Sequence, residues 1–186
     1  MGISGRKSLT VLLAIIVLVI SSLRVGFAAT QGTLGATSTG TSVVTLTIPA
    51  LFRISGIGDL ALGTYSGTGT MTANDDICVY SNSSGNYRVR ITDNSEMTAN
   101  QFAVENAANT GQIAMEVRWN DVIGITGNVA VTYNTPLASQ TGANTQTTDC
   151  SVGGLKANLQ VNFTQANLLA APASAYSSTL TITIEP

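Results

Sequence analysis

The feature that most constrains this chain is a set of short segments in which every second residue is apolar and the residues between are polar. The period is clearest over residues 155–163 and 180–184, and it recurs over 87–91 and 113–119. Successive side chains of a β-strand point to opposite faces, so each segment predicts a half-buried strand. About seven to nine such strands predict an all-β antiparallel sandwich. We expect its core to include Val89, Ile91, Met115, Val117, Leu159, Val161, Leu180 and Ile182.

The segments between the predicted strands are polar and rich in turn-forming residues. Residues 82–85 predict a hairpin-like link, and residues 136–149 predict a long polar loop. Thr164 can cap a single helical turn that runs through Leu169. The polar residues of the segment 155–163, Asn158 among them, are expected to face water.

The N-terminus predicts export. Residues 1–28 have the features of a secretory signal peptide: Arg6 and Lys7, an apolar run over residues 9–20, and a small-x-small cleavage site at residues 26–28. The apolar run is shorter than the roughly 20 residues that span a bilayer. We therefore expect an exported mature chain, located at the cell surface or outside the cell.

The charge of the expected mature chain is sparse and negative. Without Arg6, Lys7 and Arg24, five cations remain against ten acids. So few cations cannot form a phosphate-binding stripe, and we expect no nucleic-acid partner. The chain contains no His, which excludes His-based acid–base catalysis and most zinc or copper sites. We expect no enzymatic activity, no cofactor, no metal and no membrane span in the mature chain.

The chain has two cysteines, Cys78 and Cys150. In an oxidising compartment an even pair most often forms a disulfide. The loop it encloses would contain about 70 residues, which is worth roughly 4 kcal/mol in the chain-entropy model. The alternative is two separate reduced thiols.

Acidic residues offer one alternative function. Asp75 with Asp76, or Asp93 with Glu96, could bind calcium in a loop. Neither pair has the spaced oxygen ligands of a known calcium loop, so solvated acids are the competing interpretation.

Aromatic residues offer a second alternative function. Trp119, Tyr80 and Tyr87 could form a platform on which a sugar stacks. Trp119 stands in phase with the apolar residues of the segment 113–119, which favours packing in the core instead.

Three pieces of the chain, in order, match a known domain. Residues 59–65 (DLALGTY) are similar to its L-x-F-G-x-Y element, residues 77–80 and 87–90 to its Cys strand and the strand that follows, and residues 176–184 to its closing strand. Over about residues 42–186 the chain resembles the spore-coat-U-type domain. This family includes pilin subunits of chaperone–usher fibres, notably of the archaic type. The early Cys usual in such subunits is absent near residues 51–53.

The resemblance implies an immunoglobulin-like sandwich that lacks one strand. A periplasmic chaperone would fill the gap first, and after transfer at an outer-membrane usher the N-terminal segment of the next subunit would fill it. The resemblance thus implies a structural subunit of a surface fibre (a pilus) for adhesion or biofilm, polymerising by donor-strand exchange. Its partners would be identical or related subunits, the chaperone and the usher.

The residues themselves supply a candidate donor strand. Val44, Leu46 and Ile48 alternate with threonines in residues 43–49, directly after a flexible tail over residues 29–42. Residues 50–186 would then be the sandwich. The alternative is that this segment is the first strand of a complete sandwich, in which case the chain would be a self-contained secreted binding module that recognises a glycan.

Overall fold

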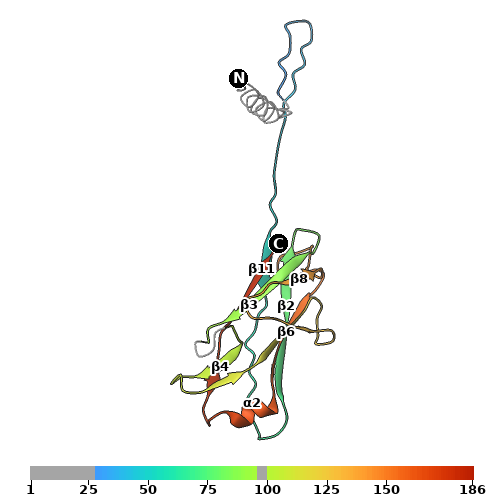
Figure 1. The fold of residues 1–186 in the computed structure, drawn as a ribbon. Coiled ribbons are helices and arrows are strands. Elements are labelled where there is room, and N and C mark those ends of the chain that lie inside the picture. Colours follow the sequence, from blue (N-terminus) through green and yellow to red (C-terminus); the bar gives the residue numbers. More distant parts are fainter. Residues whose placement is uncertain (1–27, 96–99) are drawn as a thin grey trace, which may run out of the picture. The chain divides into compact units, whose positions relative to one another are not determined.

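The computed structural model describes residues 28–95 and 100–186 of the chain (Figure 1). The chain divides into two compact units, residues 1–48 and 49–186, and every strand named below lies in the second. The predicted signal peptide lies, except for its last residue, outside the described residues. In the described part of the chain, no helix is long and apolar enough to cross a membrane.

The described residues of the first unit are exposed. In the predicted tail, Thr30 and Thr41 form an isolated antiparallel bridge with backbone hydrogen bonds of 3.1 and 3.0 Å, and their hydroxyl oxygens lie 2.6 Å apart. Residues 43–49, whose alternation is typical of a half-buried strand, form no strand with any described part of their own chain.

The first layer of the second unit is one antiparallel sheet of five strands. In the order in which they pair, these are β1 (Phe52–Ser55), β2 (Met71–Ser81), β9 (Ala157–Phe163), β6 (Glu116–Asn120) and β7 (Val129–Ala130). The long strand β2 pairs with β1 through its C-terminal part and with β9 through its N-terminal part.

The second layer consists of two three-stranded antiparallel sheets. One has the order β11 (Leu180–Glu185), β3 (Tyr87–Asp93), β8 (Leu137–Gln140), and the other has the order β10 (Tyr176–Ser177), β4 (Ala103–Asn106), β5 (Gln112–Ala114). Because β10 and β11 follow one another closely, one C-terminal segment pairs first with β4 and then with β3. The predicted all-β sandwich is confirmed.

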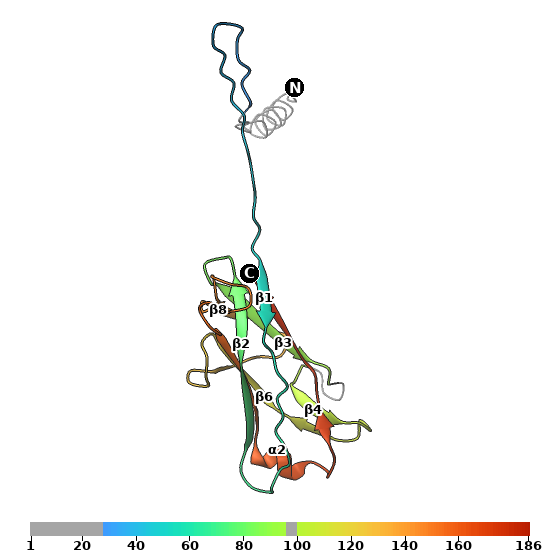
Figure 2. The same ribbon diagram turned by 180° about the vertical axis from the view of Figure 1, so that it is seen from behind.

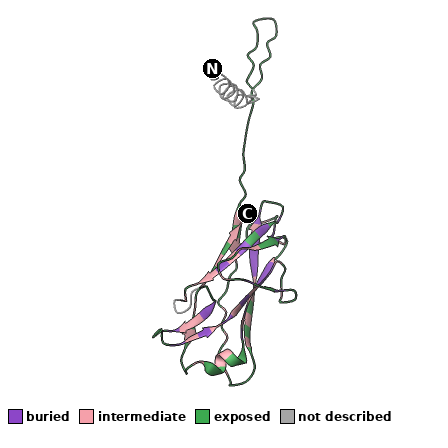
Figure 3. Cartoon of the chain, in the orientation of Figure 1, coloured by how far each residue is buried: buried purple, intermediate pink, exposed green. Residues whose placement is uncertain are grey.

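The core lies between the layers and is built by the alternation seen in the sequence (Figure 3). Six of the eight residues predicted to be buried are buried: Val89, Ile91, Met115, Val117, Leu159 and Val161. Trp119 is fully buried, and its Nε1 donates a 3.2 Å hydrogen bond to the hydroxyl of Tyr87, which is also buried. Burial raises the pKa of the Tyr87 hydroxyl well above its ordinary value. Packing in the core, rather than a sugar platform, is therefore confirmed for these two rings.

Two predicted connections are wrong. Residues 82–86 do not close a hairpin, because β2 and β3 belong to different layers and each pairs with other strands. The predicted polar loop over residues 136–149 contains β8, whose Leu137 pairs with Val89 and whose Gln140 pairs with Tyr87.

The predicted helical turn is present as α2 (Gln165–Ala170). Thr164 caps it, since its hydroxyl accepts a 3.2 Å hydrogen bond from the amide of Asn167. The side chain of Asn167 donates to the carbonyl of Ala114 on β5, so α2 covers the outer edge of that strand.

Asn158 was expected to face water, and this prediction is wrong. It points away from the core but is 0% exposed. Its amide donates hydrogen bonds of 2.7 Å to Asp76 and 3.2 Å to Asn74. The loop over residues 121–128 lies above it, anchored where the amide of Gly124 donates to Asp76.

Candidate functional site

The second unit has an open edge between its two layers. β1 and β11 face one another there without pairing. Each strand pairs on one side only, β1 with β2 and β11 with β3. Within the described residues, the other side of each strand presents unpaired backbone groups. Such an edge is a template for a further strand.

The core-facing side chains of these edge strands are incompletely covered. On β11, Leu180, Ile182 and Ile184 are half-buried and alternate with exposed threonines. On β1, Phe52 and Ile54 are half-buried in the same way. The prediction that Leu180 and Ile182 are buried is therefore wrong, because it rested on alternation alone, and β11 pairs on one side only among the described strands.

The chain that follows β1 continues this edge without forming a strand. From β1 it runs toward α2 (Figure 2), and Leu60 and Leu62 pack against the core on the way. Residues 59–68 form no hydrogen bond with any described residue, while the flanking amides of Gly58 and Gly69 donate only to side chains. This segment is a second stretch of unpaired backbone opposite the C-terminal strands.

A mostly apolar hollow lies beside α2, lined in part by the chain that follows β1. Its volume is about 890 Å³. The residues that line it include Leu62, Met71, Val104, Phe163, Leu168 and Tyr176. Tyr65 also lines it, and the hydroxyl of Tyr65 is buried without a hydrogen-bond partner among the described residues. The hollow can accept an apolar side chain from another strand. The hydroxyl of Tyr65 can then form a hydrogen bond with the backbone of that strand.

The predicted donor residues lie in the first unit and are solvent-exposed. Val44 is 91% exposed, Leu46 is 83% exposed and Ile48 is 68% exposed. Large apolar side chains placed in phase and left in water are unfavourable unless another surface covers them. The described chain does not itself provide that cover.

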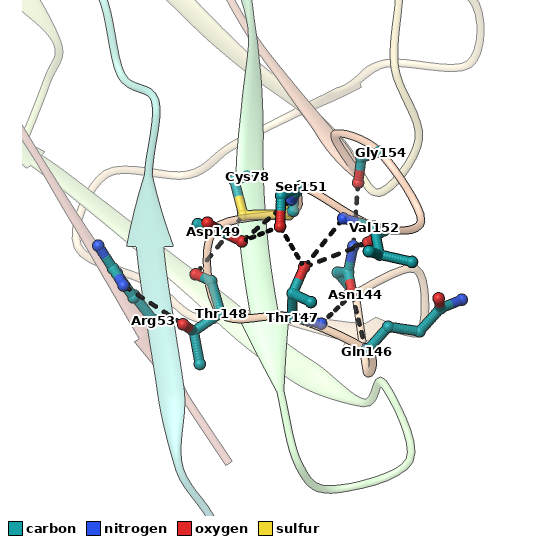
Figure 4. Close-up of a disulfide and its surroundings, with 11 residues drawn as sticks. Arg53, Cys78, Asn144, Gln146, Thr147, Thr148, Asp149, Ser151, Val152 and Gly154 are labelled. Atoms are coloured by element: carbon teal, nitrogen blue, oxygen red, sulfur yellow. Dashed lines mark hydrogen bonds between the residues drawn. A yellow bond between two sulfur atoms is a disulfide. The ribbon is translucent and has the colours of Figure 1, made fainter.

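The predicted disulfide is confirmed. Cys78 on β2 bonds Cys150 with a Cα–Cα distance of 5.8 Å, and both residues are buried (Figure 4). The bond fixes the loop over residues 141–155 to β2 at Cys78, which pairs with Ser55, the last residue of β1.

Hydrogen bonds hold the rest of this loop in place (Figure 4). The buried amide of Asn144 donates to the carbonyls of Val152, at 2.6 Å, and Gly154, at 3.2 Å. Arg53 on β1 donates a 3.3 Å hydrogen bond to the hydroxyl of Thr148. The loop is thereby joined to both strands on this side of the open edge.

The acids considered for calcium are engaged within the fold. Asp75 and Asp76 are half-buried and each accepts a hydrogen bond from a backbone amide, at 2.6 and 2.8 Å, so they are not simply solvated. Asp93 accepts a 2.7 Å hydrogen bond from the backbone amide of Ala103. Glu96 lies outside the described residues. Across residues 28–95 and 100–186, no group of three or more His, Cys, Asp or Glu side chains is placed to hold a metal ion.

Comparisons with known proteins identify no family. No protein-family model matches the chain, and no curated protein matches it. Among solved structures, the chain is similar to one from a chaperone–tip adhesin complex described as vital for the synergistic activation of CFA/I fimbriae biogenesis. The sequence identity is 17%, the TM-score is 0.48, and the match covers 74% of this chain and 41% of that chain. The present chain thus spans less than half the length of that protein.

Proposed function

We propose that this chain is a structural subunit of a chaperone–usher-type surface fibre, which polymerises by donor-strand exchange and serves adhesion or biofilm formation. The observation that carries the proposal is the open edge: β1 and β11 present unpaired backbone and half-buried apolar rows to a gap between the layers. A strand from another copy would pair with this backbone and cover these side chains.

The exposed residues of the first unit have the pattern that the gap requires. Val44, Leu46 and Ile48 share one face of an extended strand, and β11 offers the matching period in Leu180, Ile182 and Ile184. Burying each donor side chain is worth roughly 1.5–3 kcal/mol. Covering the apolar side chains of β11 adds to this free energy. A chain whose open edge is unpaired therefore gains stability when it binds the donor strand of a second copy.

The connection between the two units favours one direction for the inserted strand. β1 begins where β11 ends, since Phe52 pairs with Ser81 and Glu185 pairs with Arg88, while α2 lies at the opposite end. Only residues 49–51 separate the donor segment from β1, a reach of about 14 Å at most between Ile48 and Phe52.

With so short a connection, the donor must leave the groove at the end that faces the next copy. A donor parallel to β11 would leave at the end where β1 begins, and the two copies would meet through like ends and stop. A donor antiparallel to β11 leaves beside α2, so every copy presents its α2 end to the β1 end of the next. This heterologous contact repeats without limit, as a fibre requires.

The proposed partners follow from the same edge. A subunit that waits for assembly exposes core side chains and unpaired backbone, which promotes aggregation. A periplasmic chaperone that lends a strand would prevent this, and an outer-membrane usher would exchange it for the donor of the next subunit. The signal-peptide pattern and the disulfide support an exported chain.

Electrophoresis of native and heat-treated exported protein tests the proposal. We expect a ladder of oligomers that resists detergent and collapses to monomer on boiling, with filaments visible by electron microscopy. Expression with a neighbouring chaperone gene should yield a soluble one-to-one complex. A wild-type chain that is a stable monomer without a chaperone and without a ladder would end the proposal.

A further inference from the structure

Each end of the second unit carries an exposed leucine. Leu51, immediately before β1, is 52% exposed, and Leu169 on α2 is 60% exposed. Residues 41–52 contain no charged side chain, and neither do residues 164–179 around α2. These two ends are the ones that the proposed antiparallel insertion brings together.

The backbone of Leu51 is fixed in place by a single neighbour, Asn82. The side-chain oxygen of Asn82 accepts a 2.7 Å hydrogen bond from the amide of Leu51, and the amide of Asn82 donates to the carbonyl of Leu51 at 3.2 Å. The side-chain nitrogen of Asn82 also donates to the carbonyl of Pro49, at 3.0 Å. Leu51 is therefore presented to solvent from a rigid position rather than from a loose linker.

Leu169 stands at the rim of the apolar hollow. Its neighbour Leu168 packs against the core, whereas Leu169 is exposed and lines the hollow. A donor strand that leaves the groove beside α2 passes this rim. If Ile48 fills the hollow, Leu51 of the same copy lies three residues further along the chain, within about 11 Å.

We propose that Leu169 of one copy packs against Leu51 of the next copy, in an end-to-end contact separate from the donor strand. This inference rests on the proposed function. Residues 164–179 around α2 contain no charged side chain, so no salt bridge to that segment can hold the contact, and added salt should not dissolve it. Asn82 connects this contact to the start of β1, because it forms hydrogen bonds with Leu51 and Pro49. The contact would stiffen the joint between neighbouring subunits.

A crosslink between copies tests the contact. In the full-length chain, Leu51→Cys and Leu169→Cys are introduced together, and assembled fibres are oxidised mildly. We expect the boiled, non-reduced sample to retain a ladder that reducing agent abolishes. The native cysteines do not interfere, because they are bonded to each other and buried. The control pairs Leu169→Cys with Val122→Cys, since Val122 is comparably exposed on the loop over residues 121–128, and it should give no ladder.

The possible outcomes separate the contact from the function. Fibres that form but do not crosslink more than the control overturn the contact and leave the proposed function standing. A wild type without fibres overturns both. Should the double variant not assemble, Leu51→Asp alone decides, because Leu51 does not line the hollow. Fibres that bend more than wild type by electron microscopy support the contact, and fibres of unchanged stiffness overturn it.

Discussion

Ile182 lies directly opposite Ile91 in the antiparallel ladder of β11 and β3, yet Ile91 is fully buried and Ile182 is only half-buried. The two side chains have the same chemistry and face the same core. They differ because β3 has a neighbour on each side, β11 and β8, whereas β11 has β3 alone among the described strands. The difference in burial between these two residues therefore reports the uncovered edge beside β11.

This difference predicts how the two residues respond to truncation. In the isolated subunit Ile91→Ala should cost about 2–5 kcal/mol, the range for deletion of buried Leu or Ile side chains, and Ile182→Ala should cost less. In the assembled fibre the cost of Ile182→Ala should approach that of Ile91→Ala, because a donor strand then covers the site. Urea unfolding of both forms measures this. Equal costs in the isolated subunit would contradict the open edge.

Leu46→Asp should block polymerisation and leave the subunit folded. A carboxylate placed in an apolar groove without a partner is far more costly than the loss of one leucine. The matched control is Thr45→Asp, because Thr45 lies on the other face of an extended strand and the same charge would meet solvent. Gel ladders with and without a chaperone report the result. If Leu46→Asp instead unfolds the monomer, the segment completes its own sandwich and the binding-module alternative is favoured.

Removal of the disulfide should lower the free energy of unfolding. The bond closes a long loop, and the chain-entropy model predicts a loss of about 4 kcal/mol when Cys78 and Cys150 are both replaced by Ala. Denaturant unfolding of wild type and double variant measures the difference. Thiol labelling of denatured, non-reduced wild type should find no free cysteine, and two labelled thiols would refute the pairing.

Asn158→Ala should destabilise the sandwich by about 1–3 kcal/mol. Asn158 is buried and bonded to Asp76 and Asn74, so its removal leaves Asp76 short of a donor under the loop over residues 121–128. Asn162→Ala serves as the control, since Asn162 lies on the same face of β9 and its bond to Thr72 is exposed. Similar losses in the free energy of unfolding for the two variants would show that the buried hydrogen bonds under the loop contribute no more than an exposed one.

Asp149 should titrate well below an ordinary aspartate. Hydrogen bonds from the hydroxyl and the amide of Ser151 lower the pKa of Asp149 from 3.8 to about 2. A lowered pKa in the folded state means that the stabilisation is complete above about pH 4 and is lost as the pH falls toward 2. NMR titration of the Asp149 carboxyl checks the value. Ser151→Ala removes the hydroxyl and keeps the amide, so it should return the pKa part of the way toward 3.8, and an unchanged pKa in this variant would exclude the hydroxyl as the main cause.

Local patterns were sufficient to predict the inner strands. The alternation in β3, β6 and β9 identified which residues enter the core, because the period of two is a property of the strand itself. The cap at Thr164 was equally readable, since a capping hydroxyl needs only the next few residues.

Features that depend on distant neighbours were not predictable from the same patterns. The burial of Ile182 depends on whether a strand lies beyond β11. The burial of Asn158 depends on the loop over residues 121–128, which covers a face that alternation assigns to water. In β8 only Leu137 and Gln140 are half-buried or buried, so the sequence of this strand resembles that of a loop. The link over residues 82–86 has hairpin composition, but it joins strands of different layers.

The disulfide also limits how far a subunit can lengthen under load. In the proposed fibre, tension enters the second unit at Pro49 and leaves through the groove strands, so a subunit that yields begins to unravel between these points. The bond between Cys78 and Cys150 takes the chain between them, a sequence separation of 72, out of the extensible chain. At 3.3–3.6 Å per residue this locks away about 240–260 Å in every subunit. An oxidised fibre should therefore give way in short steps and a reduced one in long steps, so the redox state of the compartment in which the subunit folds sets the reach of the finished filament.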